Sequence, residues 1–147
     1  MPRRPGSVLF ACTMNSIRSP MAAAILRHLQ GSHIFVDSVG VRPAEVDGFA
    51  VTAMDEIGID LSRHKSKSFE ELEDTSFDMV ISLSPEAHHS ALELTRTMDC
   101  EVEFWPTMDP SLVEGNREDR LEAYRQARDL LKARILKRFP SHRASDT

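Results

Sequence analysis

The chain has 147 residues, 41% of them hydrophobic, and a formal net charge of −5 from 18 basic and 23 acidic residues. This length fits one domain able to bury roughly 70% of its unfolded surface, and the acidic balance excludes the basic surface of a protein that binds nucleic acid or an anionic membrane. Two cysteines form no disulfide framework or zinc motif, and no apolar window reaches membrane-spanning length, so we expect a cytoplasmic protein without metal or cofactor.

Strands and helices are expected to alternate along the chain, because apolar runs alternate with helix-start signals. The expected strands are residues 7–11, 34–36, 77–83 and 101–105. The expected helices are residues 19–30, a helix capped by Asp47 and stopped by Gly58, one that begins at Ser84 and Pro85, and one that Asn116 opens and Pro140 ends. This order predicts an α/β fold, a doubly wound sheet of four parallel strands flanked by helices. We expect a single domain over residues 1–139 and a flexible tail over 140–147.

Polar side chains come after the ends of these predicted strands. They are Cys12, Ser38, Ser84 and Asp109. Ligands of a doubly wound sheet bind beyond the carboxyl ends of its strands. The sequence therefore predicts that these four residues lie at one rim of the sheet.

The loop after the first strand carries a cysteine and, six positions later, an arginine. A nucleophilic cysteine must be ionised, and its usual pKa of about 8.5 falls to roughly 3.5–7.5 beside an arginine or a helix N-terminus. Arg18 offers a planar fork to an oxyanion, and Ser19 is expected to cap the following helix and to donate to the thiolate. Consecutive backbone N–H groups can curl around the same anion. These groups belong to Thr13, Met14, Asn15, Ser16, Ile17 and Arg18. The pattern predicts a tetrahedral oxyanion held directly over the sulfur of Cys12.

A leaving oxygen that departs from such an anion needs a proton donor. Asp109 is the best candidate, because Pro110 holds it in extended geometry within the loop after the fourth strand. Three other features are given simpler interpretations. His88 and His89 are assigned to a solvated helix face, and residues 63–67 to a solvated basic run. Cys100 is assigned as a buried or bystander thiol, with a redox partnership with Cys12 as the alternative.

These residues resemble the low-molecular-weight protein tyrosine phosphatases and their relatives, the thioredoxin-coupled arsenate reductases. The run from Cys12 to Pro20, CTMNSIRSP, is similar to the family pattern C-x-G-N-x-x-R-S-P, and Asp109-Pro110 to its general-acid pair. The resemblance implies the phosphatase I type of fold, with Cys12 as nucleophile, Arg18 as phosphate clamp and Asp109 as acid. It also implies a supporting hydrogen-bond network. The members of this network are Asn15, Ser19, Ser38 and His64.

The chain departs from the family pattern at several positions. Met14 replaces a glycine, which requires a negative φ there, and Ile17 replaces a second cysteine. Ser111 and Leu112 stand where many tyrosine phosphatases carry tyrosines. The segment 40–68 is short, as in the arsenate reductases, but residues 83–89 lack the thiols those enzymes use.

Three functions remain open at this point. The first is a metal-free phosphomonoester phosphatase, acting on a phosphorylated protein or a small phosphoester through a phosphocysteine. The second is an arsenate reductase, whose Cys12 adduct is resolved by Cys100, glutathione, glutaredoxin or thioredoxin. The third is a non-catalytic module that binds phosphate or another inorganic oxyanion. No nucleic acid or membrane partner is expected, and the sequence does not determine the oligomeric state.

Overall fold

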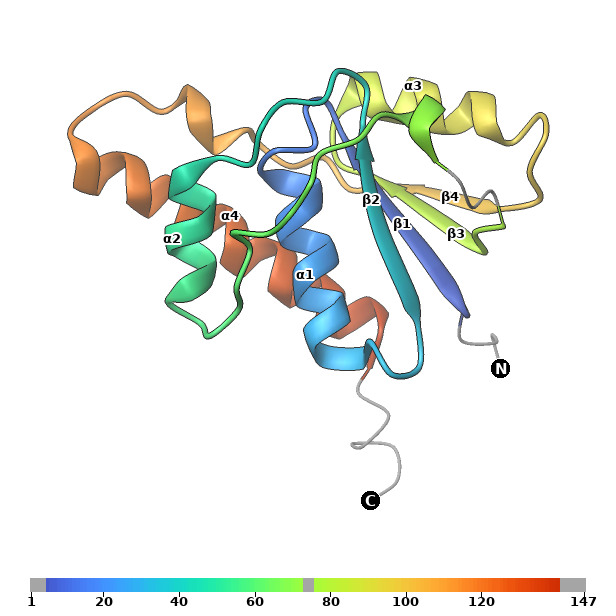
Figure 1. Cartoon of the computed structure of the whole chain (residues 1–147), viewed down its shortest axis with the longest axis horizontal. Helices are drawn as coiled ribbons and strands as arrows, with labels where there is room; N and C mark the ends of the chain where they lie inside the picture. The colour runs from blue at the N-terminus through green and yellow to red at the C-terminus, as the bar shows by residue number, and fades with distance from the viewer. Residues whose placement is uncertain (1–4, 73–75, 141–147) are drawn as a thin grey trace.

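The computed structural model describes residues 5–72 and 76–140, so of the predicted tail all but Pro140 lies outside the described residues. One parallel sheet forms the centre of the fold (Figure 1). In chain order the elements are β1 (Ser7–Cys12), α1 (Arg18–Gln30), β2 (Phe35–Gly40), α2 (Gly48–Asp55), the 3-10 helix η1 (Phe69–Glu71), β3 (Met79–Ser82), α3 (Pro85–Leu94), β4 (Glu101–Phe104), the 3-10 helix η2 (Pro110–Leu112) and α4 (Arg117–Arg138). The predicted α/β class with four parallel strands is confirmed.

The strands lie in the order β2-β1-β3-β4, and every neighbouring pair is parallel. Cys12 is level with Gly40 at the end of β2, and Ala11 is level with Ser82 at the end of β3. All four carboxyl ends therefore meet at one edge of the sheet. β1 and β3 are almost wholly buried, as their continuous apolar sequences require.

Helices cover both faces of the sheet (Figure 1). α1, α2 and α4 share one core with the side chains of Val8, Phe10 and Ile81, while α3 closes a smaller core that contains Leu9 and Val80. The alternation along β1 follows from strand geometry, because successive side chains point to opposite faces. The doubly wound arrangement is thus built into the sequence of the central strand.

Three of the predicted helix starts are confirmed by their caps. The side chain of Asp47 accepts from the backbone of α2, Ser84 accepts from Ala87, and Asn116 forms a capping box with Asp119. The expectation that Ser19 caps the first helix was wrong. α1 begins at Arg18 after Ile17 without any side-chain cap, because the Ser19 hydroxyl is engaged in the loop described below.

The second strand extends farther than its apolar residues predicted. It ends at Gly40, so Ser38 lies inside β2 rather than after it. Polar Asp37 and Ser38 are tolerated in this strand because each has a partner: Lys67 Nζ lies 2.5 Å from Asp37 Oδ2, and Asn15 donates to Ser38 Oγ at 3.0 Å. β3 and β4 are shorter than predicted, at four residues each.

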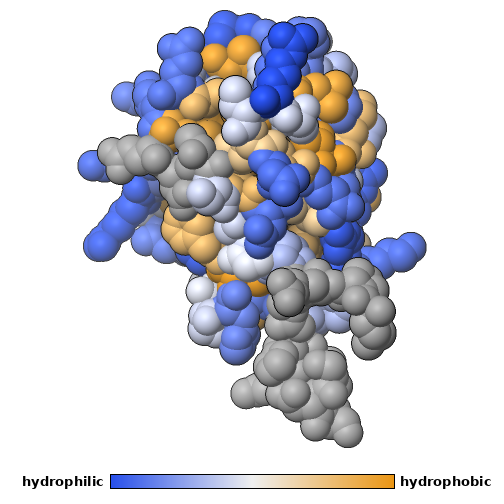
Figure 2. Space-filling view, turned by 90° about the vertical axis from the view of Figure 1, so that its right-hand side faces the viewer, coloured by the Kyte–Doolittle hydropathy of each residue, from blue (hydrophilic) through white to orange (hydrophobic). Residues whose placement is uncertain are grey.

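The surface combines charged and apolar side chains. On the side shown in Figure 2, apolar patches are interrupted by hydrophilic residues. The exposed large hydrophobic residues include Met108, directly before Asp109, and Leu112, three positions after it, which are 70% and 75% exposed. Within residues 5–72 and 76–140, no helix has the length and apolar character needed to cross a bilayer.

Candidate active site

The sulfur of Cys12 lies at the carboxyl end of the central strand, buried beneath a loop that leads directly into α1. Ser19 Oγ is 2.9 Å from Sγ, and the backbone N–H groups of Asn15 and Ser19 point at Sγ from 3.3 and 3.4 Å. A group with this many donors around it is a good acceptor. The sulfur thus lies within hydrogen-bonding distance of one hydroxyl and two backbone N–H groups.

The carbonyl groups of the loop point outward. Those of Cys12, Thr13, Met14 and Ser16 accept from the backbone of residues 41–47, at 2.9–3.2 Å. The backbone N–H groups of Thr13, Met14, Ser16, Ile17 and Arg18 donate to no acceptor among the described residues. With its carbonyls turned away and its N–H groups unused, the loop forms a concave nest suited to an anion.

Asn15 holds this loop in shape. It is the only described non-glycine residue with a positive φ, at 53°, and its side chain is fully buried. Its Nδ2 donates to Ser19 Oγ at 2.8 Å as well as to Ser38, while its Oδ1 accepts from the backbone of Lys67 at 3.0 Å. Asparagine tolerates the left-handed region better than most residues. The side chain thus ties together the loop, β2 and the segment before β3.

His64 completes the network that the resemblance implied. Its Nε2 lies 3.1 Å from the backbone oxygen of Asn15 and 3.2 Å from Asn15 Oδ1. Both partners are acceptors, so we assign the ring proton to Nε2. Burial lowers the pKa of His64 below its usual 6.5, against the opposing effect of its hydrogen bond to Asn15.

Sequence reasoning missed two members of the network. Ser66 Oγ donates to the Asn15 carbonyl at 2.6 Å, and Lys67 contributes its backbone N–H to Asn15. Both belong to the basic run that was assigned to solvent, and that interpretation was wrong for them and for His64, all of which are partly buried. A short basic run does not show in its sequence which of its members are solvated and which are packed. Here the packing depends on a bridge between Gly40 and Ser68, which brings this segment against the end of β2.

Arg18 is buried between the loop and the segment after β4. Its Nη1 donates to the carbonyl of Thr107 at 2.9 Å, and its Nη2 lies 4.0 Å from Asp109 Oδ2. Asp109 Oδ1 accepts from the N–H and the hydroxyl of Ser111, which fixes the carboxylate and leaves Oδ2 toward Arg18. The structure therefore brings Asp109 to the same site as Cys12 and Arg18. Thr107 gave no sequence signal, because it contributes only its backbone.

The remaining loop residues also have defined positions. Thr13 donates to Ser84 Oγ at 2.9 Å, which links the loop to the start of α3. The φ of Met14 is not positive, and its side chain is 38% exposed, so it is compatible with the position of the family glycine. Ile17 is buried in the core shared with α1 and α4.

Cys100 lies at the opposite end of the sheet from Cys12. It immediately precedes β4, and the strand registers place it five residues farther back, about 16 Å along the strands. A disulfide needs Cα atoms about 4.4–6.8 Å apart. Burial and neighbouring Asp99 also raise the pKa of the Cys100 thiol, which makes it a poor nucleophile. The structure therefore does not bring Cys100 to the site.

The two adjacent histidines on α3 differ from one another. His88 is half-buried, shares a 2.8 Å hydrogen bond with Ser82 Oγ and stacks on Phe104 with the ring centroids 4.6 Å apart. His89 is exposed. The solvated interpretation was thus wrong for His88 and is confirmed for His89.

A parallel sheet whose central strand ends in a cysteine, followed by an oxyanion nest and an arginine, defines a class of small α/β proteins that bind an oxyanion beside a thiol. The family model described as low molecular weight phosphotyrosine protein phosphatase matches residues 7–137, and the chain belongs to this family.

The relatives carry two kinds of name. An arsenate reductase of Shouchella clausii is 33% identical over 130 residues, which cover 88% of this chain and 92% of the relative. A low molecular weight protein tyrosine phosphatase from T. tengcongensis has a TM-score of 0.75 at 26% identity and covers 89% of this chain and 95% of its own. An arsenate reductase in the phosphate binding state has a TM-score of 0.69 at 30% identity, with coverages of 89% and 94%. These similarities establish the family without deciding between the two reactions.

Proposed function

We propose that the protein is a cysteine-dependent phosphomonoester phosphatase. The observation that carries this proposal is the position of Asp109, whose Oδ2 lies 4.0 Å from Nη2 of Arg18, the last residue of the oxyanion nest. Binding a phosphate requires neither a thiol nor an acid, so the pair of Cys12 and Asp109 argues against a module that only binds. A thiolate and an acid at one oxyanion site are the two groups that ester cleavage needs.

The first step forms a phosphocysteine. The thiolate of Cys12 attacks phosphorus, an S–P bond forms, and the P–O bond to the leaving group breaks. Asp109 gives its proton to the departing oxygen. The N–H groups of the nest and the guanidinium of Arg18 stabilise the charge on the three equatorial oxygens, which is where catalysis of phosphoryl transfer acts.

The second step returns the enzyme to its starting state. Asp109, now ionised, takes a proton from a water molecule, whose oxygen attacks phosphorus. The S–P bond breaks, inorganic phosphate leaves, and the thiolate is regenerated. No electron is exchanged in either step, so the cycle requires no second thiol. Substrates of this reaction are phosphorylated proteins or small phosphoesters, and we place it in the cytoplasm.

Arsenate reduction is the second candidate, because several curated relatives are named arsenate reductases. In that reaction the thiolate adds to arsenate with loss of hydroxide, a second thiol attacks the Cys12 sulfur, and arsenite leaves with the electron pair of the S–As bond. The second thiol must reach the site. Residues 83–89 contain none and Cys100 is remote, so an external thiol such as glutathione, glutaredoxin or thioredoxin would have to supply it.

One pair of assays separates these functions. The purified protein is offered p-nitrophenyl phosphate, and in parallel arsenate with glutathione and glutaredoxin or with thioredoxin and its reductase. We expect release of p-nitrophenol and little consumption of reductant. Reductant consumed only with arsenate would assign the reductase function, and tight phosphate binding without either reaction would assign the binding module.

A further inference from the structure

We propose that a pocket between α2 and α4 binds an acidic side chain of a phosphorylated protein substrate, next to the site that holds its phosphate. The inference rests on the proposed phosphatase function and deepens it, because it names a specificity site. The pocket has a volume of about 450 Å³ and is lined by Asp47, Gly48, Phe49, Thr52, Arg117 and Arg120.

This pocket adjoins the catalytic loop. The backbone N–H of Asp47 donates to the carbonyl of Ser16 at 3.0 Å, so the first lining residue is in direct contact with the oxyanion nest. Asp47 also accepts from the hydroxyl of Tyr124 on α4 at 3.1 Å. A polypeptide whose phosphorylated residue occupies the nest can therefore place a side chain a few residues away against this wall.

Two arginines of the pocket have no acidic partner. Arg117 and Arg120 lie over the ring of Phe49, with the guanidinium carbons 5.8 and 4.8 Å from its centroid. Neither forms an ion pair with any carboxylate in the described part of the chain. Stacking on an aromatic ring restrains both side chains without using their N–H donors. The donors remain free for a carboxylate.

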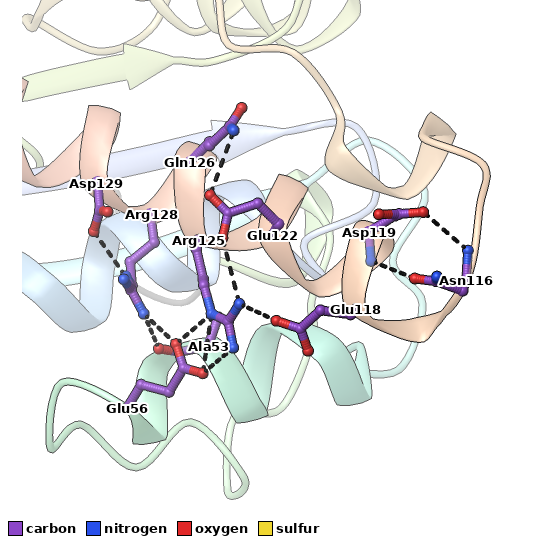
Figure 3. A network of polar contacts seen from close by, with 10 residues as sticks. All are labelled: Ala53, Glu56, Asn116, Glu118, Asp119, Glu122, Arg125, Gln126, Arg128 and Asp129. Atoms are coloured by element: carbon purple, nitrogen blue, oxygen red, sulfur yellow. Dashed lines mark hydrogen bonds and ion pairs between the residues drawn. The ribbon is translucent and has the colours of Figure 1, made fainter.

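The acidic residues nearby are already engaged (Figure 3). Glu56, Glu118 and Glu122 all contact Arg125, at 2.8, 2.7 and 3.3 Å. Asp119 pairs with Asn116 in the capping box. Asp47, which lines the pocket itself, accepts from the backbone of α2 and from the hydroxyl of Tyr124. Each of these carboxylates thus has partners other than Arg117 and Arg120, although the chain as a whole is acidic.

The two arginines are also poorly placed for stability. Both lie in the first turns of α4, whose N-terminus carries the positive end of the helix dipole. Cations there are disfavoured. Positions that oppose local stability and face a pocket beside the active site are better explained by an anionic ligand than by folding.

The test compares two phosphotyrosine peptides that differ only in having glutamates or glutamines near the phosphorylated residue. The double variant Arg117→Gln and Arg120→Gln removes both charges and keeps side-chain length. The control variant Arg63→Gln and Arg96→Gln removes two exposed charges elsewhere. We expect wild type to prefer the acidic peptide about tenfold in kcat/KM, at about threefold per arginine, and the pocket variant alone to lose that preference.

Hydrolysis of p-nitrophenyl phosphate should be unchanged in both double variants, because this small ester does not reach the pocket. Hydrolysis of the small ester without any preference between the peptides would overturn the inference and leave the phosphatase function intact. If no ester is cleaved, the phosphatase function fails, and calorimetric binding of the two peptides to the Cys12→Ser variant decides the pocket separately. Equal affinities of the Cys12→Ser variant for the two peptides would refute the site for an acidic side chain. The same holds if the pocket variant and the control variant lose the preference for the acidic peptide equally.

Discussion

Asn15 combines a strained backbone with a buried hydrogen-bonding side chain, and the two contributions can be separated by substitution. Asn15→Gly keeps the positive φ and removes the hydrogen bonds, whereas Asn15→Ala removes the hydrogen bonds and adds strain. We expect the glycine variant to lose about 3 kcal/mol of unfolding free energy and the alanine variant about 1 kcal/mol more. Urea unfolding measures both, and equal losses would show that φ at this position carries no cost.

Asp109 allows a chemical test at the same scale. If Asp109 protonates the leaving oxygen, Asp109→Asn should slow the hydrolysis of phenyl phosphate at least tenfold more than that of p-nitrophenyl phosphate. The reason is that the stable p-nitrophenolate anion hardly needs the proton. The kcat values for the two esters give the answer. Equal losses for both would make Asp109 a loop residue that only caps η2 through its contacts with Ser111.

At the scale of elements, the end of β2 is fitted tightly against the loop that follows Cys12. A Cβ added at Gly40 would lie 2.6 Å from the Asn15 nitrogen and 2.8 Å from the Met14 carbonyl carbon, and backbone atoms cannot easily withdraw. Gly48, at the start of α2, has no atom within 4 Å of the same position. An alanine substitution at Gly48 is therefore the matched control for the same substitution at Gly40.

We expect Gly40→Ala to lower stability by about 2 kcal/mol, or roughly 5 °C in Tm, and to weaken phosphate binding because the nest is displaced. Gly48→Ala should leave Tm unchanged or slightly raised. Thermal unfolding with and without phosphate tests this expectation. A tolerant Gly40→Ala variant with normal phosphate binding would mean that β2 does not support the loop.

Much of this architecture could be predicted because its signals are local. The buried run of β1, the caps at Ser84 and Asn116 and the spacing of Cys12 and Arg18 are each visible within a few residues. The second strand was predicted too short, because the partners that allow Asp37 in a strand come from Lys67, thirty positions away. The network members Ser66 and Lys67 were missed for the same reason: pairing between distant segments leaves no local pattern.

At the scale of the whole molecule, polar contacts join α4 to the end of α2 through Glu56, and join the loop after Cys12 to β2 and to His64 through Asn15. Glu56 has its pKa lowered to about 2, mainly by its hydrogen bond to Arg125, so the α2–α4 connection persists until strongly acidic pH (Figure 3). His64 behaves differently, because its pKa is lowered from 6.5 and its neutral form is the one that the fold favours.

This shift predicts a pH dependence of stability. Below about pH 6.5 the unfolded chain binds a proton at His64 more readily than the folded chain does. The contribution of His64 to the free energy of unfolding is therefore fully present above that pH, and it is lost as the pH falls through the folded pKa. His64→Gln retains a donor for the Asn15 carbonyl and should flatten the dependence, whereas His89→Gln should not. Urea unfolding between pH 5 and 7.5 checks the prediction, and identical slopes in wild type and His64→Gln would contradict it.

The central claim is that catalysis passes through a phosphate bonded to Cys12, and it can be observed directly. The protein is mixed with p-nitrophenyl phosphate, quenched in acid within one turnover, digested and analysed by mass spectrometry. We predict one phosphoryl group, carried by Cys12, and none in the Cys12→Ser variant, which should still bind phosphate through the nest and Arg18. Turnover with no adduct on Cys12, or hydrolysis retained by Cys12→Ser, would contradict the account.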